Sequence, residues 1–171
     1  HAFDGQMLDA LFLTGFKRPD DLKCALMGVR QVTDIPVFAS VDVDGAGMLP
    51  DGRTSIEEAV ALMAEFGASV VGFECAAPES DVVAVARRAA GACDLPLVVQ
   101  LEVLRRDPKQ GAASEENPYY CADTMVSAAL ALRAAGVQFL RATGDASPAY
   151  TGALAAAVMG LDVALSTGQE R

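Results

Sequence analysis

The 171-residue sequence contains no tryptophan, a single histidine and few positive charges. Because that histidine is His1, an internal Ser-His-Asp or Cys-His catalytic arrangement is excluded for this chain. Thirteen Lys and Arg residues against 23 Asp and Glu residues give a net charge of −10. Such a surface repels nucleic acids and anionic membranes, so we expect neither as a partner. No apolar run reaches the roughly 18 residues that a membrane-spanning helix requires.

Paired cysteines and nucleotide-binding motifs are also missing. The four cysteines, at positions 24, 75, 93 and 121, are far apart and form no Cys-x-x-Cys pair. This spacing argues against a disulfide scaffold or a zinc knuckle and is typical of a reducing compartment, so we expect a cytoplasmic protein. No GxGxxG follows the first apolar run and no Walker A motif occurs, which leaves nucleotide binding without support. The sequence begins with His1 and shows no signal peptide, so we expect a piece of a longer chain.

Hydrophobic residues, in contrast, make up 52% of the chain, enough to form a core. At this length we expect a single domain over residues 1–171. Five short apolar runs have the near-continuous hydrophobicity of parallel strands that are buried on both faces. These predicted strands cover residues 10–13, 36–43, 69–75, 95–103 and 137–142. We expect them to pair in sequence order and to bury Val37, Val70, Val71, Val98, Val99, Phe139 and Leu140.

The segments between the runs have helical periodicity. Leu22, Ala25, Leu26 and Val29 follow the i, i+3, i+4, i+7 pattern, and Ala-rich helices are predicted over residues 82–90, 122–135 and 153–159. Residues 54–57 (TSIE) have the form of a capping box. The alternation of strands and helices predicts an α/β protein with a parallel sheet. It leaves two architectures open: a doubly wound sheet, or five-eighths of an eight-stranded barrel, which takes about 250 residues when complete.

In both architectures the active face lies at the carboxyl ends of the strands. Four carboxylates fall at or near predicted strand ends, and together they would form a ring of oxygen ligands for a divalent cation such as Mg²⁺: Asp42, Glu74, Glu102 and Asp145. The alternative, which we favour, is that they are solvated loop carboxylates. Cys75 ends a buried strand just before a helix, a position that favours a reactive thiolate. The alternative is an inert buried cysteine.

Several segments in order resemble one family. They are residues 21–25 (DLKCA), 36–40 (PVFAS), 51–60 (DGRTSIEEAV), 71–79 (VGFECAAPE), 135–137 (AGV) and 145–148 (DASP). Their order and spacing are similar to those of the homocysteine S-methyltransferase family, which includes the homocysteine-binding barrel of cobalamin-dependent methionine synthase. The resemblance covers nearly the whole chain. It implies the last five β/α units of a TIM-type (β/α)8 barrel, with the first three strands absent from this chain.

The resemblance also implies a chemistry. Family members hold zinc through three cysteine thiolates and methylate the zinc-bound sulfur of homocysteine, with methylcobalamin, methylfolate, betaine or S-methylmethionine as the donor. Cys75 is the only residue that matches a zinc ligand, because the double cysteine of the family falls on Thr143 and Gly144. Glu74 replaces the family's Asn before the first ligand, and Thr14 replaces its Glu on the first strand. We therefore expect no zinc and no other cofactor.

The sequence is consistent with two functions. One is a divergent methyltransferase that transfers a methyl group to a thiol or related small substrate, with a reactive face built from Asp42, Glu74, Cys75 and Asp145. The other is a non-catalytic barrel module that binds a small ligand or a partner protein, such as a corrinoid protein. Five strands of a barrel leave two open edges, so we also expect self-association as a homodimer, or docking onto the missing N-terminal part.

Overall fold

The computed structural model describes residues 8–106, 109 and 111–159, in which strands and helices alternate. The strands are β1 (Leu11–Phe16), β2 (Val37–Asp42), β3 (Val70–Cys75), β4 (Leu97–Val103) and β5 (Phe139–Gly144). The helices are α1 (Pro19–Arg30), α2 (Ile56–Glu65), α3 (Glu79–Ala92), α4 (Ala122–Ala134) and α5 (Pro148–Val158). His1 lies outside the described residues.

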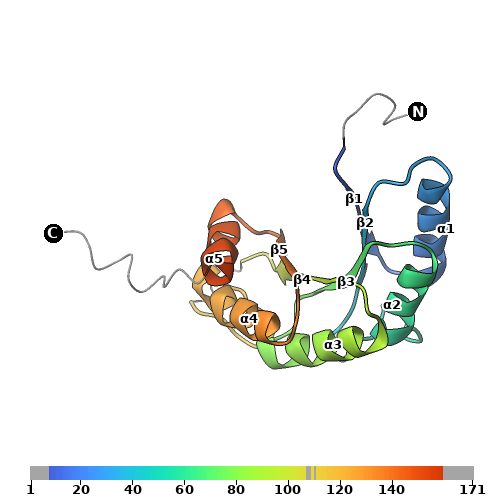
Figure 1. Cartoon of the computed structure of the whole chain (residues 1–171). Coiled ribbons are helices and arrows are strands. Elements are labelled where there is room, and N and C mark those ends of the chain that lie inside the picture. The colour runs from blue at the N-terminus through green and yellow to red at the C-terminus, as the bar shows by residue number, and fades with distance from the viewer. Residues whose placement is uncertain (1–7, 107–108, 110, 160–171) are drawn as a thin grey trace.

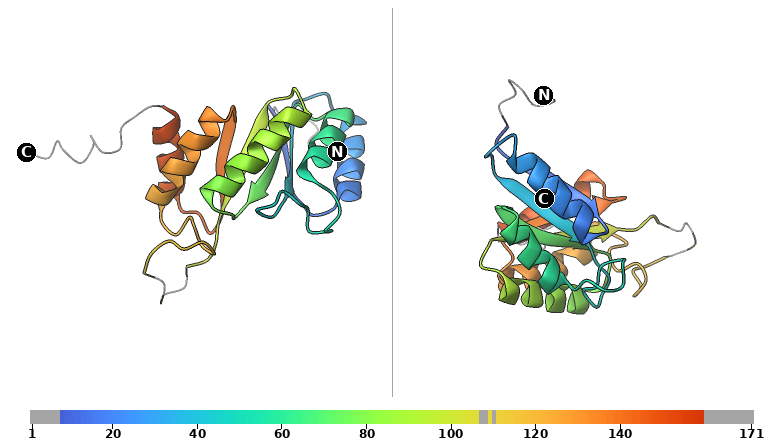
Figure 2. Two further views of the ribbon diagram at one scale, coloured as in Figure 1. Left: turned by 90° about the horizontal axis from the view of Figure 1, so that it is seen from below. Right: turned by 90° about the vertical axis from the view of Figure 1, so that its right-hand side faces the viewer.

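All five strands are parallel and lie in the order β1-β2-β3-β4-β5, which confirms the predicted pairing. The sheet curls into an open arc whose convex side carries the helices (Figure 1). Seen from below, the helices form one layer in front of the strands (Figure 2). A doubly wound sheet would have helices on both faces. The fold is therefore a half-barrel, as expected for part of a TIM-type barrel.

The core fills the space between the convex side of the sheet and the helices. Val37, Phe73 and Val99 of the strands are fully buried there, as are Leu22 of α1 and Met63 of α2. These side chains come from the apolar stripe of each helix and from alternate positions of each strand, so the helices and the sheet bury each other.

The predicted burial is confirmed for the valines but wrong for Phe139, which is 41% exposed, and Leu140 is only partly buried. Both belong to β5, which is the last strand of the sheet in the described residues. A hollow between β5 and α5 is lined by residues that include Phe139, Leu154 and Val158. Self-association through such an edge stays a prediction.

Two helix starts differ from the sequence pattern. The capping box of α2 is formed by Ser55 and Glu58, one residue later than predicted: the Ser55 hydroxyl accepts from the Glu58 N–H, and the Glu58 carboxylate accepts from the Ser55 N–H. Thr54 instead donates its hydroxyl to Asp51. Helix α5 begins at Pro148 rather than at residue 153, because proline is favoured in the first turn of a helix. Among the described residues, no helix has the length and apolarity needed to span a membrane.

Candidate functional site

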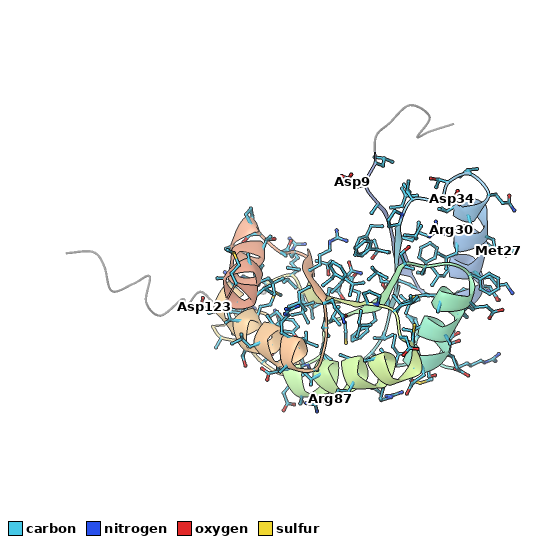
Figure 3. All side chains as sticks on the ribbon, viewed as in Figure 1. Asp9, Met27, Arg30, Asp34, Arg87 and Asp123 are labelled. Atoms are coloured by element: carbon cyan, nitrogen blue, oxygen red, sulfur yellow. The ribbon has the colours of Figure 1, made fainter. Side chains whose placement is uncertain are left out.

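The concave side of the arc is lined by alternate residues of all five strands, since successive side chains of a strand point to opposite faces. The strand registers place the following residues on this concave face: Phe12 and Thr14 of β1; Phe38, Ser40 and Asp42 of β2; Val70, Gly72 and Glu74 of β3; Val98, Gln100 and Glu102 of β4; Phe139, Arg141 and Thr143 of β5. Side chains fill the inside of the arc in Figure 3. The concave face is thus apolar near the strand starts and polar toward the strand ends.

Three phenylalanines cover the concave face near the strand starts. The ring of Phe38 stacks on Phe12 with 5.4 Å between centroids and meets the edge of Phe139 at 5.0 Å. Phe38 lies on β2 and Phe139 on β5, so the curl brings these side chains together across β3 and β4. The end of the concave face near the strand starts is therefore lined by aromatic rings.

A hydrogen-bond network crosses the middle of the concave face. Gln100 is fully buried, and its Nε2 donates to Ser40 Oγ at 2.6 Å and to Thr14 Oγ1 at 3.0 Å. Ser40 Oγ lies 3.2 Å from Thr14 Oγ1. The Oε1 atom of Gln100 accepts from Arg141 Nη1 at 3.0 Å. Four strands are tied together by this single buried amide, which fixes the positions of Thr14 and Arg141.

Arg141 joins the two edges of the sheet. It extends from β5, and its guanidinium carbon lies 5.2 Å from the centroid of the Phe12 ring on β1. A guanidinium at this distance is attracted by the face of the ring. The side chain of Arg141 remains exposed on the concave face beyond these contacts.

Acidic side chains gather at the strand ends of the concave face. Burial raises the pKa of Glu74 above its usual range, and the charges of Asp42 and Glu102 raise it further. A hydrogen bond from Thr143 Oγ1 to Glu74 Oε1, 2.9 Å long, partly opposes this shift. Burial likewise raises the pKa of Asp42, against the opposing charge of Lys17. Glu74 is thus a half-buried carboxylate that holds a proton more tightly than a free one.

The ring of oxygen ligands, the less favoured of the two interpretations of these four carboxylates, is not formed among the described residues. Asp145 lies exposed after the end of β5. Within residues 8–106, 109 and 111–159, no group of three or more His, Cys, Asp or Glu side chains could hold a metal ion. Asp42, Glu74 and Glu102 are brought to one face, but as an electrostatically coupled set rather than as a ligand cage.

Cys75 lies on the other side of the sheet from Glu74, because the two residues are consecutive on β3. It is 2% exposed and belongs to the core between the sheet and the helices. Its Sγ accepts from the N–H of Ala77 at 3.4 Å, and burial raises the pKa of the thiol to about 11. The predicted pair of Glu74 and Cys75 is therefore divided between the two faces, and Cys75 is a neutral thiol near pH 7.

The network residues Ser40, Gln100 and Arg141 were absent from the predicted site. Each is a polar residue within a largely apolar strand. Ser40 and Gln100 lie two positions before Asp42 and Glu102, and therefore on the same face, and Arg141 pairs with Gln100. That placement is the signal that would have found them. A polar side chain inside a buried run needs a hydrogen-bond partner, and partners lie on the same face of neighbouring strands.

One comparison with known proteins shows a family, and the solved structures show the fold. The model of the homocysteine S-methyltransferase family matches residues 3–158. The metallated form of the homocysteine methyltransferase MmuM from Escherichia coli is similar in structure, with a TM-score of 0.68 and 18% identity over 91% of this chain and 47% of that chain. The oxidized form has a TM-score of 0.65 and 20% identity over 86% of this chain and 45% of that chain.

A lyase/mutase from Burkholderia cenocepacia J2315 has a TM-score of 0.65 at 20% identity, over 92% of this chain and 59% of that chain. At these identities the structural likeness shows the fold alone. The chain spans less than half the length of the MmuM structures. A comparison with curated proteins gives no match.

Proposed function

We propose a function from one premise: the chain belongs to the homocysteine S-methyltransferase family. This membership supports methyl transfer as the class of reaction. We propose that the acceptor is a thiol or a related small molecule that binds on the concave face. The observation that carries this proposal is Glu74, a half-buried carboxylate with a raised pKa on the only helix-free face of the described sheet.

Glu74 has the properties of a general base for a thiol. A base works best when its pKa approaches the operating pH, and burial together with neighbouring carboxylates moves Glu74 in that direction. The Thr143 hydroxyl holds one oxygen of the carboxylate, and the other is left for a substrate. In the proposed step, Glu74 takes the thiol proton, the sulfur forms a bond to the methyl carbon, and the bond from that carbon to the donor breaks.

A non-catalytic binding module is the second candidate, and the state of Cys75 favours it. The family resemblance implies a thiolate at this position, whereas Cys75 is buried in the core with its pKa raised to about 11. A chain of this kind would bind a small ligand on the concave face without turnover. Ligand binding in the absence of any methylated product would support this second function.

The residues present do not fit the zinc site that the resemblance implies. Cys75 lies on the helix side of β3, and Thr143 and Gly144 occupy the positions of the other two thiolates. Thr143 is already hydrogen-bonded to Glu74. Zinc in such sites takes soft sulfur and imidazole ligands with tetrahedral geometry, and neither a hydroxyl nor a glycine supplies one.

We therefore expect the chain to bind no zinc at submicromolar concentrations near neutral pH. Zinc titration in competition with a chromophoric chelator measures this, and Cys75→Ser is the matched variant. Stoichiometric tight binding that is lost in Cys75→Ser would contradict the proposal, because it would require the thiol of Cys75 to be a ligand.

For the reaction itself, we expect Glu74→Gln to lower the rate of methyl transfer by about 10²–10⁴-fold, the usual contribution of a general base. The assay follows conversion of L-homocysteine to methionine with S-methylmethionine as the donor. The wild-type rate should rise with pH through the raised pKa of Glu74, because only the carboxylate accepts the proton. This rise should be absent in Glu74→Gln.

Glu65→Gln is the control, since Glu65 is an exposed residue of α2 on the convex side. Its rate should equal that of the wild type. Equal rates for Glu74→Gln and Glu65→Gln would show that Glu74 takes no part in the reaction. An unchanged pH profile in Glu74→Gln would show that another residue is the base.

A further inference from the structure

The network in the middle of the concave face leaves hydrogen-bond donors unused. Ser40 is fully buried, so the proton of its hydroxyl needs an acceptor, and Thr14 Oγ1 at 3.2 Å provides it. Thr14 Oγ1 also accepts from Gln100 Nε2 at 3.0 Å. Both lone pairs of Thr14 are thus occupied. The hydroxyl proton of Thr14, an exposed residue, is left to point into the open space of the concave face.

The orientation of the Gln100 amide follows from the same count of protons. With the amide reversed, its NH₂ group would face the guanidinium of Arg141, and two donors would meet. Gln100 Oε1 therefore faces Arg141 and accepts from Nη1. Nη1 is the one nitrogen of Arg141 with a hydrogen-bond partner among the described residues. The remaining N–H groups of the guanidinium are available to a ligand.

Thr14 and Arg141 are therefore held at the two ends of one amide, and each has a hydrogen-bond donor left for a ligand. Both contact Gln100, Thr14 through Nε2 and Arg141 through Oε1. The Phe12 ring, 5.2 Å from the guanidinium carbon, further restricts Arg141. A planar guanidinium held in this way is suited to a carboxylate, which accepts two hydrogen bonds side by side.

The charges beside Arg141 select among anions. Asp42, Glu74 and Glu102 lie on the same concave face, and the charge of Arg141 lowers the pKa of Glu74. The carboxylates on this face repel a dianion such as phosphate. They attract an ammonium group. A molecule with a carboxylate and an ammonium group a few ångströms apart, which is an α-amino acid, complements both features.

On the basis of the function proposed above, we propose that Arg141 and Thr14 form the carboxylate-binding site for an α-amino acid on the concave face. Ser40 and Gln100 are positioning residues for this site. Of the acidic residues at the strand ends, Asp42 and Glu102 face the ammonium group, and this leaves the side chain of the amino acid to extend along the concave face toward Glu74.

The experiment compares two ligands on the same proteins by calorimetry, using the whole 171-residue chain. L-Homocysteine has the carboxylate; 3-mercaptopropylamine has the same thiol and ammonium group without it. We expect Arg141→Met to weaken binding of L-homocysteine by about tenfold to a hundredfold, the range for a charge-assisted hydrogen bond. The affinity for 3-mercaptopropylamine should not fall, and this second ligand also shows that the variant is folded.

Arg87→Met is the matched control, because Arg87 is exposed on the outer side of α3 (Figure 3). It should leave both affinities unchanged, and inorganic phosphate should not compete with L-homocysteine. Equal weakening of both ligands in Arg141→Met would overturn the proposal, since it would make Arg141 a structural residue. Unchanged affinity for both ligands in Arg141→Met would also overturn the proposal. Competition by phosphate would show that the site binds anions in general rather than a carboxylate.

L-Methionine separates this proposal from the proposed function. If the wild type binds L-methionine in an Arg141-dependent way but does not bind L-homocysteine, the carboxylate site stands and the thiol acceptor is wrong. If L-homocysteine binds independently of Arg141, the acceptor stands and the carboxylate site is wrong. Binding of neither amino acid overturns the carboxylate site.

Discussion

Replacing Gly72 by alanine is expected to lower the free energy of unfolding by about 3 kcal/mol or more. A Cβ atom at this position would lie 1.8 Å from the carbonyl oxygen of Val98 and 2.6 Å from its Cγ1. Because β3 is paired on both sides, Gly72 with Ser40 and with Val98, its backbone cannot turn away. Strands β3 and β4 would have to separate. Urea denaturation of the variant and the wild type measures the difference.

Gly28→Ala is the matched control. Gly28 lies within α1, and a Cβ atom there would meet nothing within 4 Å. Since alanine favours a helix over glycine, this variant should gain up to about 1 kcal/mol of stability. A Gly72→Ala variant as stable as the wild type would mean that β3 and β4 tolerate a methyl group between them, contrary to the observed approach.

Gly72 also matters for the site, because it leaves the concave face of β3 uncovered. Gln100 on β4 reaches Ser40 on β2, and its amide must cross β3 to do so. The residue on β3 that pairs with Ser40 is Gly72, which has no side chain to block the path. The absence of a side chain at Gly72 therefore allows Gln100 to reach Ser40 and Thr14 across β3.

The order of strands and helices could be predicted from the sequence, because each apolar run is a strand that is buried against helices on at least one side. Val37, Val71 and Val99 are examples, and all three are buried. Phe139 also belongs to a predicted strand, but it is exposed because β5 is the last strand of the described sheet and the concave face is open. The local sequence pattern records neither feature.

The site was harder to predict, since its residues meet through the curl of the sheet. Thr14 and Gln100 are 86 positions apart and share a hydrogen bond. Glu74 and Cys75 are adjacent in the sequence but lie on opposite faces of β3. Neighbouring residues at a strand end look like one group in the sequence, although their side chains point to opposite faces of the sheet. Taking every second residue of each predicted strand separates the residues of the concave face from those of the core.

The buried amide of Gln100 has no substitute within the concave face. It makes three hydrogen bonds, to Thr14, Ser40 and Arg141, and no other side chain in the described residues connects these strands in the same way. A leucine of similar volume would fill the space but would accept nothing from Arg141 and donate nothing to the hydroxyls. Ser40, which is fully buried, would keep only Thr14 as a side-chain partner. Unpaired polar groups in such a place are costly.

We therefore expect Gln100→Leu to lower the free energy of unfolding by roughly 2–3 kcal/mol, the cost of leaving buried polar groups without partners. Gln31→Leu is the matched control, because Gln31 is exposed at the end of α1, and it should stay within about 0.5 kcal/mol of the wild type. Thermal and urea denaturation of both variants measure the difference. Equal stabilities for Gln100→Leu and Gln31→Leu would show that the network contributes no net stability, because the apolar gain of leucine would then offset all three lost hydrogen bonds.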